Sequence, residues 1–347
     1  MSRLSLLRAT LGCALYVCAA CGQSPASPSP EPGAAAEPGD PNAAAEAPEK
    51  KRRIAVIPKG TTHEFWKSVH AGANKAGAEL GVEIIWKGPV REDDRDEQIK
   101  VVEGFIAGGV DAIVLAPLDD RALVPPAKDA AGQNIPVVII DSDLQWEGRK
   151  SFVATDNHAG GAAAAERLSA LLEGKGKVLV LRYQEGSAST MKREAGFLEA
   201  LAAKHPGIEV VSSNQYGGAT TESAYKTAEN LLVKHRDIDG VFCPNESTTF
   251  GMLRALSDAG LAGKVRFVGF DSSEKLVQAL QEDQIHGLVL QNPFAMGELG
   301  VKTAVAALDG KSVEARIDTG VGVATHENMK EEAIVQLLSP DLGKWLK

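Results

Sequence analysis

The chain has 347 residues and a formal net charge of −9 at pH 7. This length is sufficient for two domains with separate hydrophobic cores, and the acidic balance argues against nucleic acids and anionic membrane surfaces as partners. Of the four cysteines, only Cys243 lies beyond residue 21, so neither a disulfide nor a paired-cysteine metal site is expected in the body of the chain. Cys243 ends an apolar run and is predicted to be a buried, inert thiol.

Residues 1–20 have the composition of an export signal. Arg3 and Arg8 lie before an apolar run at 11–20, and Ala19 and Ala20 come directly before Cys21. A charged segment, a short apolar segment and a small-residue cleavage site are typical of a secretory signal peptide, and this apolar segment is too short to span a bilayer. Removal of the two arginines would take the net charge from −9 to −11 (−9 − 2). The sequence therefore predicts a protein that works outside the cytoplasm.

A tether is predicted to follow, covering residues 21–52. Residues 22 to about 50 are rich in proline, alanine and glutamate and contain almost no large apolar side chain. Such a segment cannot bury enough apolar surface to offset the entropy of ordering, so we expect an extended, disordered spacer. A basic cluster at 50–53 marks the start of the body.

The body alternates short apolar runs with helical stretches. Strands are predicted at 54–57, 82–86, 112–115, 137–140, 152–155, 178–181, 210–212, 241–243 and 267–270. Helices are predicted at about 64–80, 95–108, 120–132, 158–173, 189–204, 220–235, 247–259, 273–281 and 294–308. This alternation indicates parallel strands joined by right-handed crossovers. Because nine or so strands exceed one compact six-stranded unit, the predicted fold class is α/β with two doubly wound parallel-sheet lobes.

Polar and aromatic residues follow nearly every predicted strand. In open parallel sheets, ligands bind beyond the carboxyl ends of the strands. The segments at that edge are 59–66, 116–119, 141–143, 183–193, 215–219, 245 and 271. Nearly all of them carry a hydrogen-bonding side chain or an aromatic ring, which predicts a cleft for a small polar molecule.

The body carries no motif for catalysis, metal binding or cofactor binding. His63-Glu64 lacks the second histidine of a zinc protease, and the Gly310-Lys-Ser segment has Val305 where a phosphate-binding loop needs its first glycine. No nucleophile elbow is present. We therefore expect a binding protein without cofactor, metal or enzymatic activity.

Eight motifs occur in an order typical of one family. They are IAVIPKGTTHEFWKSVHAGANKAG, DAIVLAP with PVVIIDSD, ATDNHAGG, GSASTMKREAGF, VFCPNESTTFGMLRAL, VGFDSS and LVLQNPFAMG. The chain resembles the periplasmic sugar-binding proteins of the ribose-binding type, which have the type I solute-binding fold of ABC importers. The resemblance covers about 53–347. The export signal with Cys21 is similar to a bacterial lipobox, although Cys18 stands where leucine is usual; the resemblance implies lipidation of Cys21, and a plain secretory signal is the alternative.

The resemblance implies a set of ligand-binding residues, each matched to a family motif. They are Lys59, His63, Phe65, Trp66, Asp141, Ser142, Arg193, Asn245, Asp271 and Gln291. In this set Phe65 and Trp66 would stack on a sugar face, Asp141 would accept hydrogen bonds from hydroxyls, and Arg193 would donate to sugar oxygens.

Several of these residues have a second interpretation. Trp66 could face the core, Arg193 and Asp271 could form a surface ion pair, and Lys59 could bridge to a carboxylate such as Asp143 instead of the ligand. His63 is expected at the polar rim. Lys59, Ala116 and Ser142 differ from the ribose-binding pattern, and Lys59 and Ser142 look more like the branch that binds rhamnose and a furanosyl autoinducer. That branch lacks the arginine at 193, so the identity of the sugar stays open.

The resemblance also implies the domain organisation and the partners. The first lobe would comprise 53–156 plus 292–316, the second 157–291 plus 317–347, with three crossings near 156, 291–292 and 316–320 forming a hinge. Helix 294–308 would pack on the first lobe and 328–347 on the second. The implied function is a monomeric protein that captures a pentose, hexose or related furanosyl sugar for the permease of an ABC importer. A sugar-sensing receptor for a chemoreceptor or sensor kinase is the alternative.

Overall fold

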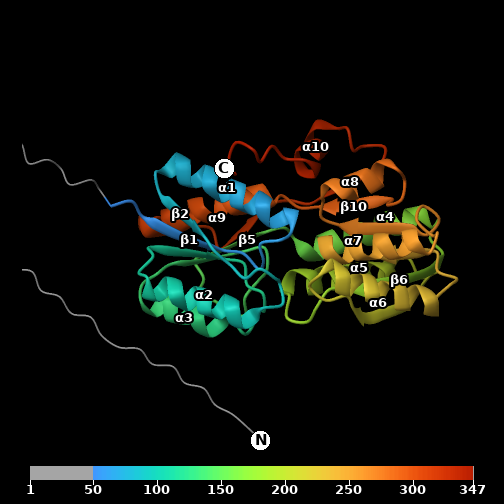
Figure 1. Cartoon of the computed structure of the whole chain (residues 1–347), viewed down its shortest axis with the longest axis horizontal. Coiled ribbons are helices and arrows are strands. Elements are labelled where there is room, and N and C mark those ends of the chain that lie inside the picture. Colours follow the sequence, from blue (N-terminus) through green and yellow to red (C-terminus); the bar gives the residue numbers. More distant parts are fainter. Residues whose placement is uncertain (1–49, 347) are drawn as a thin grey trace, which may run out of the picture. The chain divides into compact units, whose positions relative to one another are not determined.

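The computed structural model describes residues 50–346. The predicted signal peptide, Cys21 and nearly all of the tether lie outside the described residues. The α/β prediction is confirmed, because the described part of the chain forms two six-stranded, mostly parallel sheets with helices on both faces (Figure 1). Lobe 1 is built on one sheet and lobe 2 on the other.

Lobe 1 has the strand order β11-β5-β4-β3-β1-β2. Its elements are β1 (Arg53–Ile57), α1 (Glu64–Leu80), β2 (Glu83–Trp86), α2 (Arg95–Ala107), β3 (Ala112–Leu115), α3 (Val124–Gly132), β4 (Val137–Ile140), β5 (Ser151–Ala154), α9 (Pro293–Leu308) and β11 (Arg316–Asp318). The central strands are buried on both faces, which is why they are continuous apolar runs. Helices α1 and α9 cover one face, and α2 and α3 cover the other (Figure 1).

Lobe 2 has the equivalent order β12-β10-β9-β8-β6-β7. Its elements are α4 (Asn157–Leu171), β6 (Gly176–Arg182), α5 (Ala188–Lys204), β7 (Ile208–Tyr216), α6 (Thr221–Lys234), β8 (Gly240–Phe242), α7 (Glu246–Asp258), β9 (Arg266–Phe270), α8 (Glu274–Gln281), β10 (Gly287–Leu290), β12 (Gly322–Ala324) and α10 (Glu332–Leu338). Only β12 is antiparallel to its neighbour within this described sheet.

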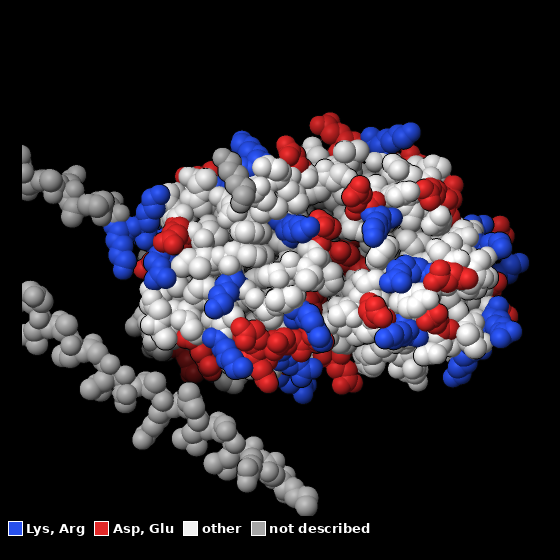
Figure 2. All heavy atoms as spheres, viewed as in Figure 1, with Lys and Arg blue, Asp and Glu red and all other residues white. Residues whose placement is uncertain are grey.

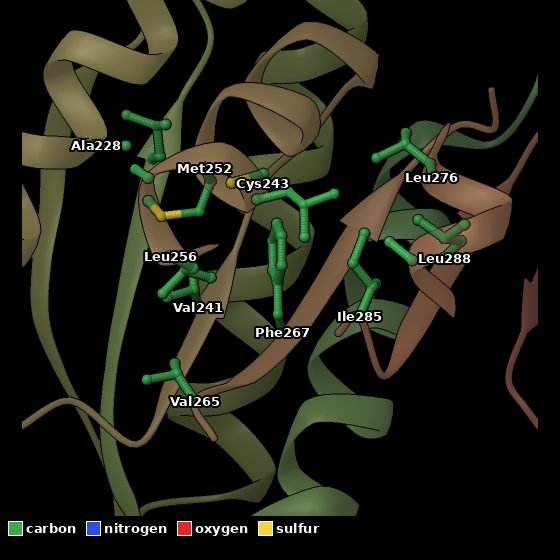
Figure 3. Close-up of a cluster of buried hydrophobic side chains, with 14 of the residues drawn as sticks. Ala228, Val241, Cys243, Met252, Leu256, Val265, Phe267, Leu276, Ile285 and Leu288 are labelled. Carbon is green, nitrogen blue, oxygen red and sulfur yellow. The ribbon is translucent and has the colours of Figure 1, made fainter. Parts of the chain in front are cut away.

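One of the two core layers of lobe 2 surrounds Cys243. The residue is fully buried between apolar side chains such as Val241, Met252 and Phe267 (Figure 3). Burial raises the pKa of the Cys243 thiol well above its usual value, which disfavours the reactive thiolate. The prediction that Cys243 is a buried core residue is confirmed.

The chain passes between the lobes at three described points. It leaves β5 for α4, whose N-terminus is capped by Asp156, and it returns from β10 to α9. Helix α9 packs along α1, and the chain crosses again between β11 and β12. The short strands β11 and β12, and β10 before them, are not in the predicted set, and α3 begins at Val124 instead of 120.

The end of the chain differs from the expectation for 328–347. Helix α10 contacts β12 of lobe 2, but the following residues return to lobe 1, where Asn74 of α1 donates a hydrogen bond of 2.9 Å to the carbonyl of Trp345. The C-terminus accordingly lies beside α1 in Figure 1. Trp345 and Lys344 line a surface recess there together with residues of α1 such as Gly77 and Ala78.

The surface of the described chain is mixed in charge. Lysine and arginine side chains are interspersed with aspartate and glutamate over the face shown in Figure 2. Within residues 50–346, no helix combines the length and the apolar character needed to cross a bilayer.

Candidate functional site

A cavity lies between the lobes at the carboxyl ends of the strands of both sheets. Its volume is about 30 Å³, room for only a few water molecules. The lining residues are Lys59, His63, Phe65, Trp66, Glu92, Asp141, Tyr183, Ser187, Ser189, Thr190, Arg193, Asn245, Glu246, Asp271 and Gln291. The structure thus brings together nine of the ten expected residues; Ser142 is the exception.

A wider recess adjoins this cavity and shares Phe65, Asp271 and Gln291 with it. The lining of the recess contains no lysine, arginine or histidine, and residues 337–342 supply much of its apolar wall. Of these two spaces, the smaller cavity is the one in which charged donors and charged acceptors converge, and we therefore take it as the candidate site.

Arg193 of α5 lies at the centre of the site. It is 2% exposed, and its Nε donates to Asn157 Oδ1 at 2.7 Å while Nη1 donates to the Pro244 carbonyl at 2.9 Å. The guanidinium is 3.9 Å from a carboxylate oxygen of both Asp141 and Asp271. These contacts hold the planar group in one orientation between the two lobes. The interpretation of Arg193 and Asp271 as a surface ion pair is wrong, because both side chains are buried.

The environment of Arg193 leaves one donor free. Nη2 has no hydrogen-bond partner among the described residues, although it is buried. Burial lowers the pKa of Arg193, and the carboxylates of Asp271 and Asp141 oppose that effect. The guanidinium also lies over the ring of Phe270, 4.0 Å from its centroid. A buried donor without a partner is costly, and Nη2 belongs to a side chain that lines the cavity.

Asp141 and Asp271 occupy equivalent positions in the two lobes. Each directly follows a central strand, β4 or β9, and each has a positive φ, 60° and 69°. This left-handed conformation is uncommon for a residue other than glycine, and aspartate tolerates it better than most. It turns the chain at the edge of the sheet and carries both carboxylates toward the cavity. Burial raises the pKa of Asp271, with Arg193 acting in the opposite direction.

Asn245 and Gln291 complete the lobe 2 side of the cavity. The Asn245 side chain caps α7 by accepting from the Thr248 backbone N–H and hydroxyl. Gln291 follows β10 and donates to Asp271 Oδ1 at 2.6 Å, while its own Oε1 has no partner among the described residues. The residues lining the cavity therefore include an unpaired acceptor, Gln291 Oε1, as well as the unpaired donor of Arg193.

Lys59 bridges the lobes at the other side of the cavity. Its Nζ is 2.7 Å from Asp141 Oδ2 and donates to Ser142 at 2.8 Å, and to Ser189 and Ser187 of lobe 2 at 3.2 and 3.4 Å. The carboxylate partner is thus Asp141, and the expected bridge to Asp143 is not formed. Ser142 does not line the cavity, since its hydroxyl bonds to Lys59 and Ser189 behind it.

The aromatic pair at the start of α1 forms one wall. Phe65 and Trp66 meet edge to face, with ring centroids 4.8 Å apart, and both are buried. Trp66 also belongs to the core layer beneath α1, so the core and cavity interpretations of this residue both hold. Its indole Nε1 donates to Glu92 at 2.6 Å, which fixes the orientation of the ring.

His63 and Glu92 form a buried ion pair beside that wall. His63 Nδ1 lies 2.5 Å from Glu92 Oε1. Burial opposes both charges, but the mutual attraction and the hydrogen bond outweigh it. They raise the pKa of His63 to about 9 and lower that of Glu92 to about 2. His63 is thus a charged member of the cavity wall, more enclosed than the rim position expected for it.

This ion pair predicts how stability depends on pH. The stabilising contribution of His63 is fully present below its ordinary pKa of 6.5 and is lost as pH rises through about 9. The contribution of Glu92 is present above 4.5 and is lost only as pH falls toward about 2. We expect the free energy of unfolding to fall by at most about 3 kcal/mol between pH 6.5 and 9, the amount that corresponds to a pKa shift of this size. The melting temperature should fall with it.

The variant His63→Gln should be less stable than wild type at pH 6 and should lose much less stability than wild type between pH 6.5 and 9, where the smaller titration of Glu246 remains. His326→Gln is the matched control, because His326 also pairs with a carboxylate, Asp283, at 3.0 Å but is exposed. Thermal melts across this range check the expectation; an unchanged alkaline slope in His63→Gln would contradict the charged pair.

Glu246 and Glu92 are site residues that sequence reasoning missed. The carboxylate of Glu246 accepts from the backbone N–H groups of Glu64 and Phe65 at 3.4 and 3.3 Å, so lobe 2 caps the start of α1 in lobe 1. Burial raises the pKa of Glu246 to about 7. Glu246 directly follows Asn245 in the segment beyond β8, and this position after a strand could have identified it as a site residue from the sequence. Glu92 lies in a run of charged residues that is typical of a solvated loop, and nothing local marks it as buried.

Comparison with known proteins agrees with this arrangement. The sequence profile of the periplasmic binding protein domain matches residues 54–312, three quarters of the chain. The chain belongs to the periplasmic binding protein family. Among metal-ligating side chains of this binding protein, no group of three or more converges within residues 50–346.

Individual relatives of this binding protein are sugar-binding proteins by name. The D-ribose/D-allose-binding protein of Pseudomonas aeruginosa is 32% identical over 278 residues, 78% of this chain and 86% of the relative. A carbohydrate transporter solute binding protein from Agrobacterium radiobacter, solved with D-arabinose, is 35% identical with a TM-score of 0.81, covering 84% of this chain and all of the other. A solute binding protein from Agrobacterium vitis with bound D-fucose is 36% identical with a TM-score of 0.80, covering 82% of this chain and 99% of the other.

Proposed function

We propose that this protein captures a monosaccharide between its lobes, outside the cytoplasm, and delivers it to an ABC importer. The observation that carries the proposal is the position of Arg193, which lies between Asp141 and Asp271 with one donor unpaired. A sugar hydroxyl both donates and accepts, so a ring of hydroxyls needs donors and acceptors close together. The aromatic wall of Phe65 and Trp66 supplies a surface for the C–H face of a sugar ring.

The charges of the site favour a neutral ligand. Three cationic side chains, Lys59, His63 and Arg193, face the carboxylates of Glu92, Asp141 and Asp271. A fourth carboxyl group, that of Glu246, has a pKa raised to about 7 and accepts from backbone N–H groups at the start of α1. Because the formal charges nearly balance, an anionic or cationic ligand would bring an uncompensated charge into a buried cavity. Pentoses, hexoses and polyols carry no such charge. The names of the relatives, which include ribose, allose, arabinose and fucose, support this class.

A thermal-shift panel tests the proposal directly. D-ribose, D-allose, D-arabinose, D-fucose, D-tagatose and xylitol are the probes, and a panel of amino acids is the control class. A ligand at about one hundred times its Kd stabilises the folded state by about 2.7 kcal/mol, so we expect a rise of roughly 5 to 10 °C with at least one sugar. A response to amino acids and none to sugars would contradict the proposal.

We extend the proposal to binding without turnover, by a monomer, and to the importer as the partner. The family and the relatives are binding proteins, which supports the first point. The sensing receptor predicted as the alternative would use the same cavity. Transport of the identified sugar by a strain lacking this protein separates the two, because an importer component is needed for uptake and a sensor is not.

The proposed location is the outer face of a membrane, through lipidated Cys21, which lies outside the described residues. The full-length chain should fractionate with membranes, and Cys21→Ser should release it without a change in sugar affinity. One acyl chain holds a protein only weakly, so stable attachment needs more than one. Recovery of the wild-type chain entirely in the soluble fraction would instead indicate an ordinary secretory signal.

A further inference from the structure

The carboxylate of Glu92 receives three hydrogen bonds from side chains that are far apart in the sequence. Glu92 is 6% exposed and lies between β2 and α2 of lobe 1. Its Oε1 accepts from Trp66 Nε1 at 2.6 Å and pairs with His63 Nδ1, and its Oε2 accepts from the hydroxyl of Tyr183 at 2.5 Å. His63 and Trp66 belong to lobe 1, but Tyr183 directly follows β6 of lobe 2. One carboxylate therefore holds the aromatic wall and also reaches across the cleft.

Two hydrogen bonds, from Tyr183 and Gln184, join lobe 2 to Glu92 across the cleft. Tyr183 is 1% exposed, and burial, reinforced by the negative charge of Glu92, raises the pKa of its phenol well above the usual value. The hydroxyl thus remains a donor to a charged acceptor, which is the stronger class of hydrogen bond. The neighbouring Gln184 donates through Nε2 to the Glu92 backbone carbonyl at 2.9 Å. Two consecutive residues of lobe 2 therefore donate hydrogen bonds to this one residue of lobe 1.

Opening of the cleft must break these contacts, whereas the contacts within lobe 1 can persist. Trp66 and His63 move with Glu92 because all three belong to the same lobe. Tyr183 and Gln184 move with the other sheet. The hydrogen bonds of Glu92 therefore fall into two groups. Those with Trp66 and His63 persist when the cleft opens, and they orient the aromatic wall. Those from Tyr183 and Gln184, here called the clasp, form only when the lobes close.

We propose that Glu92 is a positioning residue that couples the aromatic wall of the site to closure of the cleft. Through Trp66 it sets the surface on which the ligand lies, and through Tyr183 it stabilises the closed state around that ligand. The inference rests on the proposed capture of a sugar in this cavity. In this inference Glu92 acts through Trp66 and Tyr183, and it slows dissociation of the ligand.

The test is a double-mutant cycle on dissociation. Tyr183→Phe removes one hydroxyl, Glu92→Gln removes the charge, and the double variant combines them. Tyr225→Phe is the matched control, because its hydroxyl also bonds to two carboxylates, Glu229 and Asp258, but on the exposed surface of lobe 2. Dissociation and association rates are measured by stopped-flow tryptophan fluorescence with whichever of D-ribose, D-allose, D-arabinose, D-fucose, D-tagatose and xylitol raises the melting temperature of wild type.

We expect Tyr183→Phe to raise koff about tenfold or more, the effect of losing one charge-assisted hydrogen bond, with kon within about twofold of wild type. Glu92→Gln should raise koff as well, and the double variant should be less affected than the product of the two single effects. The control should match wild type. An unchanged koff in Tyr183→Phe, or effects that multiply independently, would overturn the inference while leaving sugar capture intact, since a direct contact of Tyr183 with the ligand gives independent effects.

Small-angle scattering provides a readout that does not depend on the sugar. Without ligand, Tyr183→Phe and Glu92→Gln should have a larger mean radius of gyration than wild type and Tyr225→Phe, because the closed state loses its clasp. If no sugar binds wild type, the proposed function fails, and equal radii in all four proteins would then overturn the clasp as well.

Discussion

Replacement of Arg193 by alanine is expected to cause the largest loss of both stability and ligand affinity. The variant leaves Asp271 buried without the cation that lies 3.9 Å from it, and leaves Asp141 with Lys59 alone. Removal of one partner from a buried ionic group costs about 3–5 kcal/mol. Denaturant melts should show a loss of this size, and calorimetry should show sugar affinity reduced at least tenfold, because the donor aimed into the cavity is gone.

Arg193→Lys and Asp271→Ala separate binding from folding. Lysine keeps the positive charge but not the planar fork that bonds Asn157 and the Pro244 carbonyl, so we expect a smaller loss of stability and still at least a tenfold loss of affinity. Asp271→Ala should also weaken binding about tenfold or more. Arg254→Ala is the control, since Arg254 lies on the exposed side of α7 over the ring of Tyr225. Unchanged affinity in both site variants would show that the ligand binds elsewhere.

Substitution of Gly161 by alanine is expected to disrupt lobe 2, although alanine is the better helix former. Helices α4 and α5 pack so closely that a methyl group on Gly161 would lie 1.9 Å from the carbonyl oxygen of Arg193 and 2.9 Å from the backbone nitrogen of Phe197. Both neighbours are backbone atoms and cannot rotate away, so α5 must shift. We expect a loss of about 2 kcal/mol or more in unfolding free energy, and weaker sugar binding because α5 carries Arg193.

Gly104→Ala is the matched control for Gly161→Ala. Gly104 is exposed in α2, and a methyl group there would meet no atom within 4 Å. The change should stabilise the protein by about 0.5–1 kcal/mol through helix propensity alone. Chemical denaturation of the two variants gives the comparison. A Gly161→Ala protein as stable as Gly104→Ala would show that the α4 and α5 helices are not held at this distance.

The pattern of the sequence was sufficient for the fold class and most of the site. Buried parallel strands are continuous apolar runs, and the four residues of β4 or β3 carry that signal locally. Polar residues directly after such strands must meet at one edge of the sheet. Asp141 and Asp271, each one residue beyond a central strand, were therefore predictable from position, as was Lys59. Gln291 follows β10, a strand outside the predicted set, and was indicated only by the family resemblance. The resemblance to sugar-binding proteins then singled out Arg193 on α5.

Other features depend on contacts that no local signal encodes. Strands β11 and β12 are three residues each and pair with β5 and β10, more than thirty residues away. The last residues return to lobe 1, where Asn74 donates to the Trp345 carbonyl, and nothing in the sequence near 345 indicates that contact.

The sequence by itself determined which side chains reach the edge of each sheet, because strand position and helix periodicity are local properties. Only the tertiary structure decided how those side chains pair across the cleft. It joined Lys59 to Asp141 instead of Asp143, and it turned Glu92 from a residue of a charged loop into the buried partner of Tyr183. The physical reason is that a hydrogen bond between the lobes depends on how the two sheets are placed relative to each other. That placement is determined by the surfaces that the two lobes bury against each other, and no local stretch of sequence encodes it.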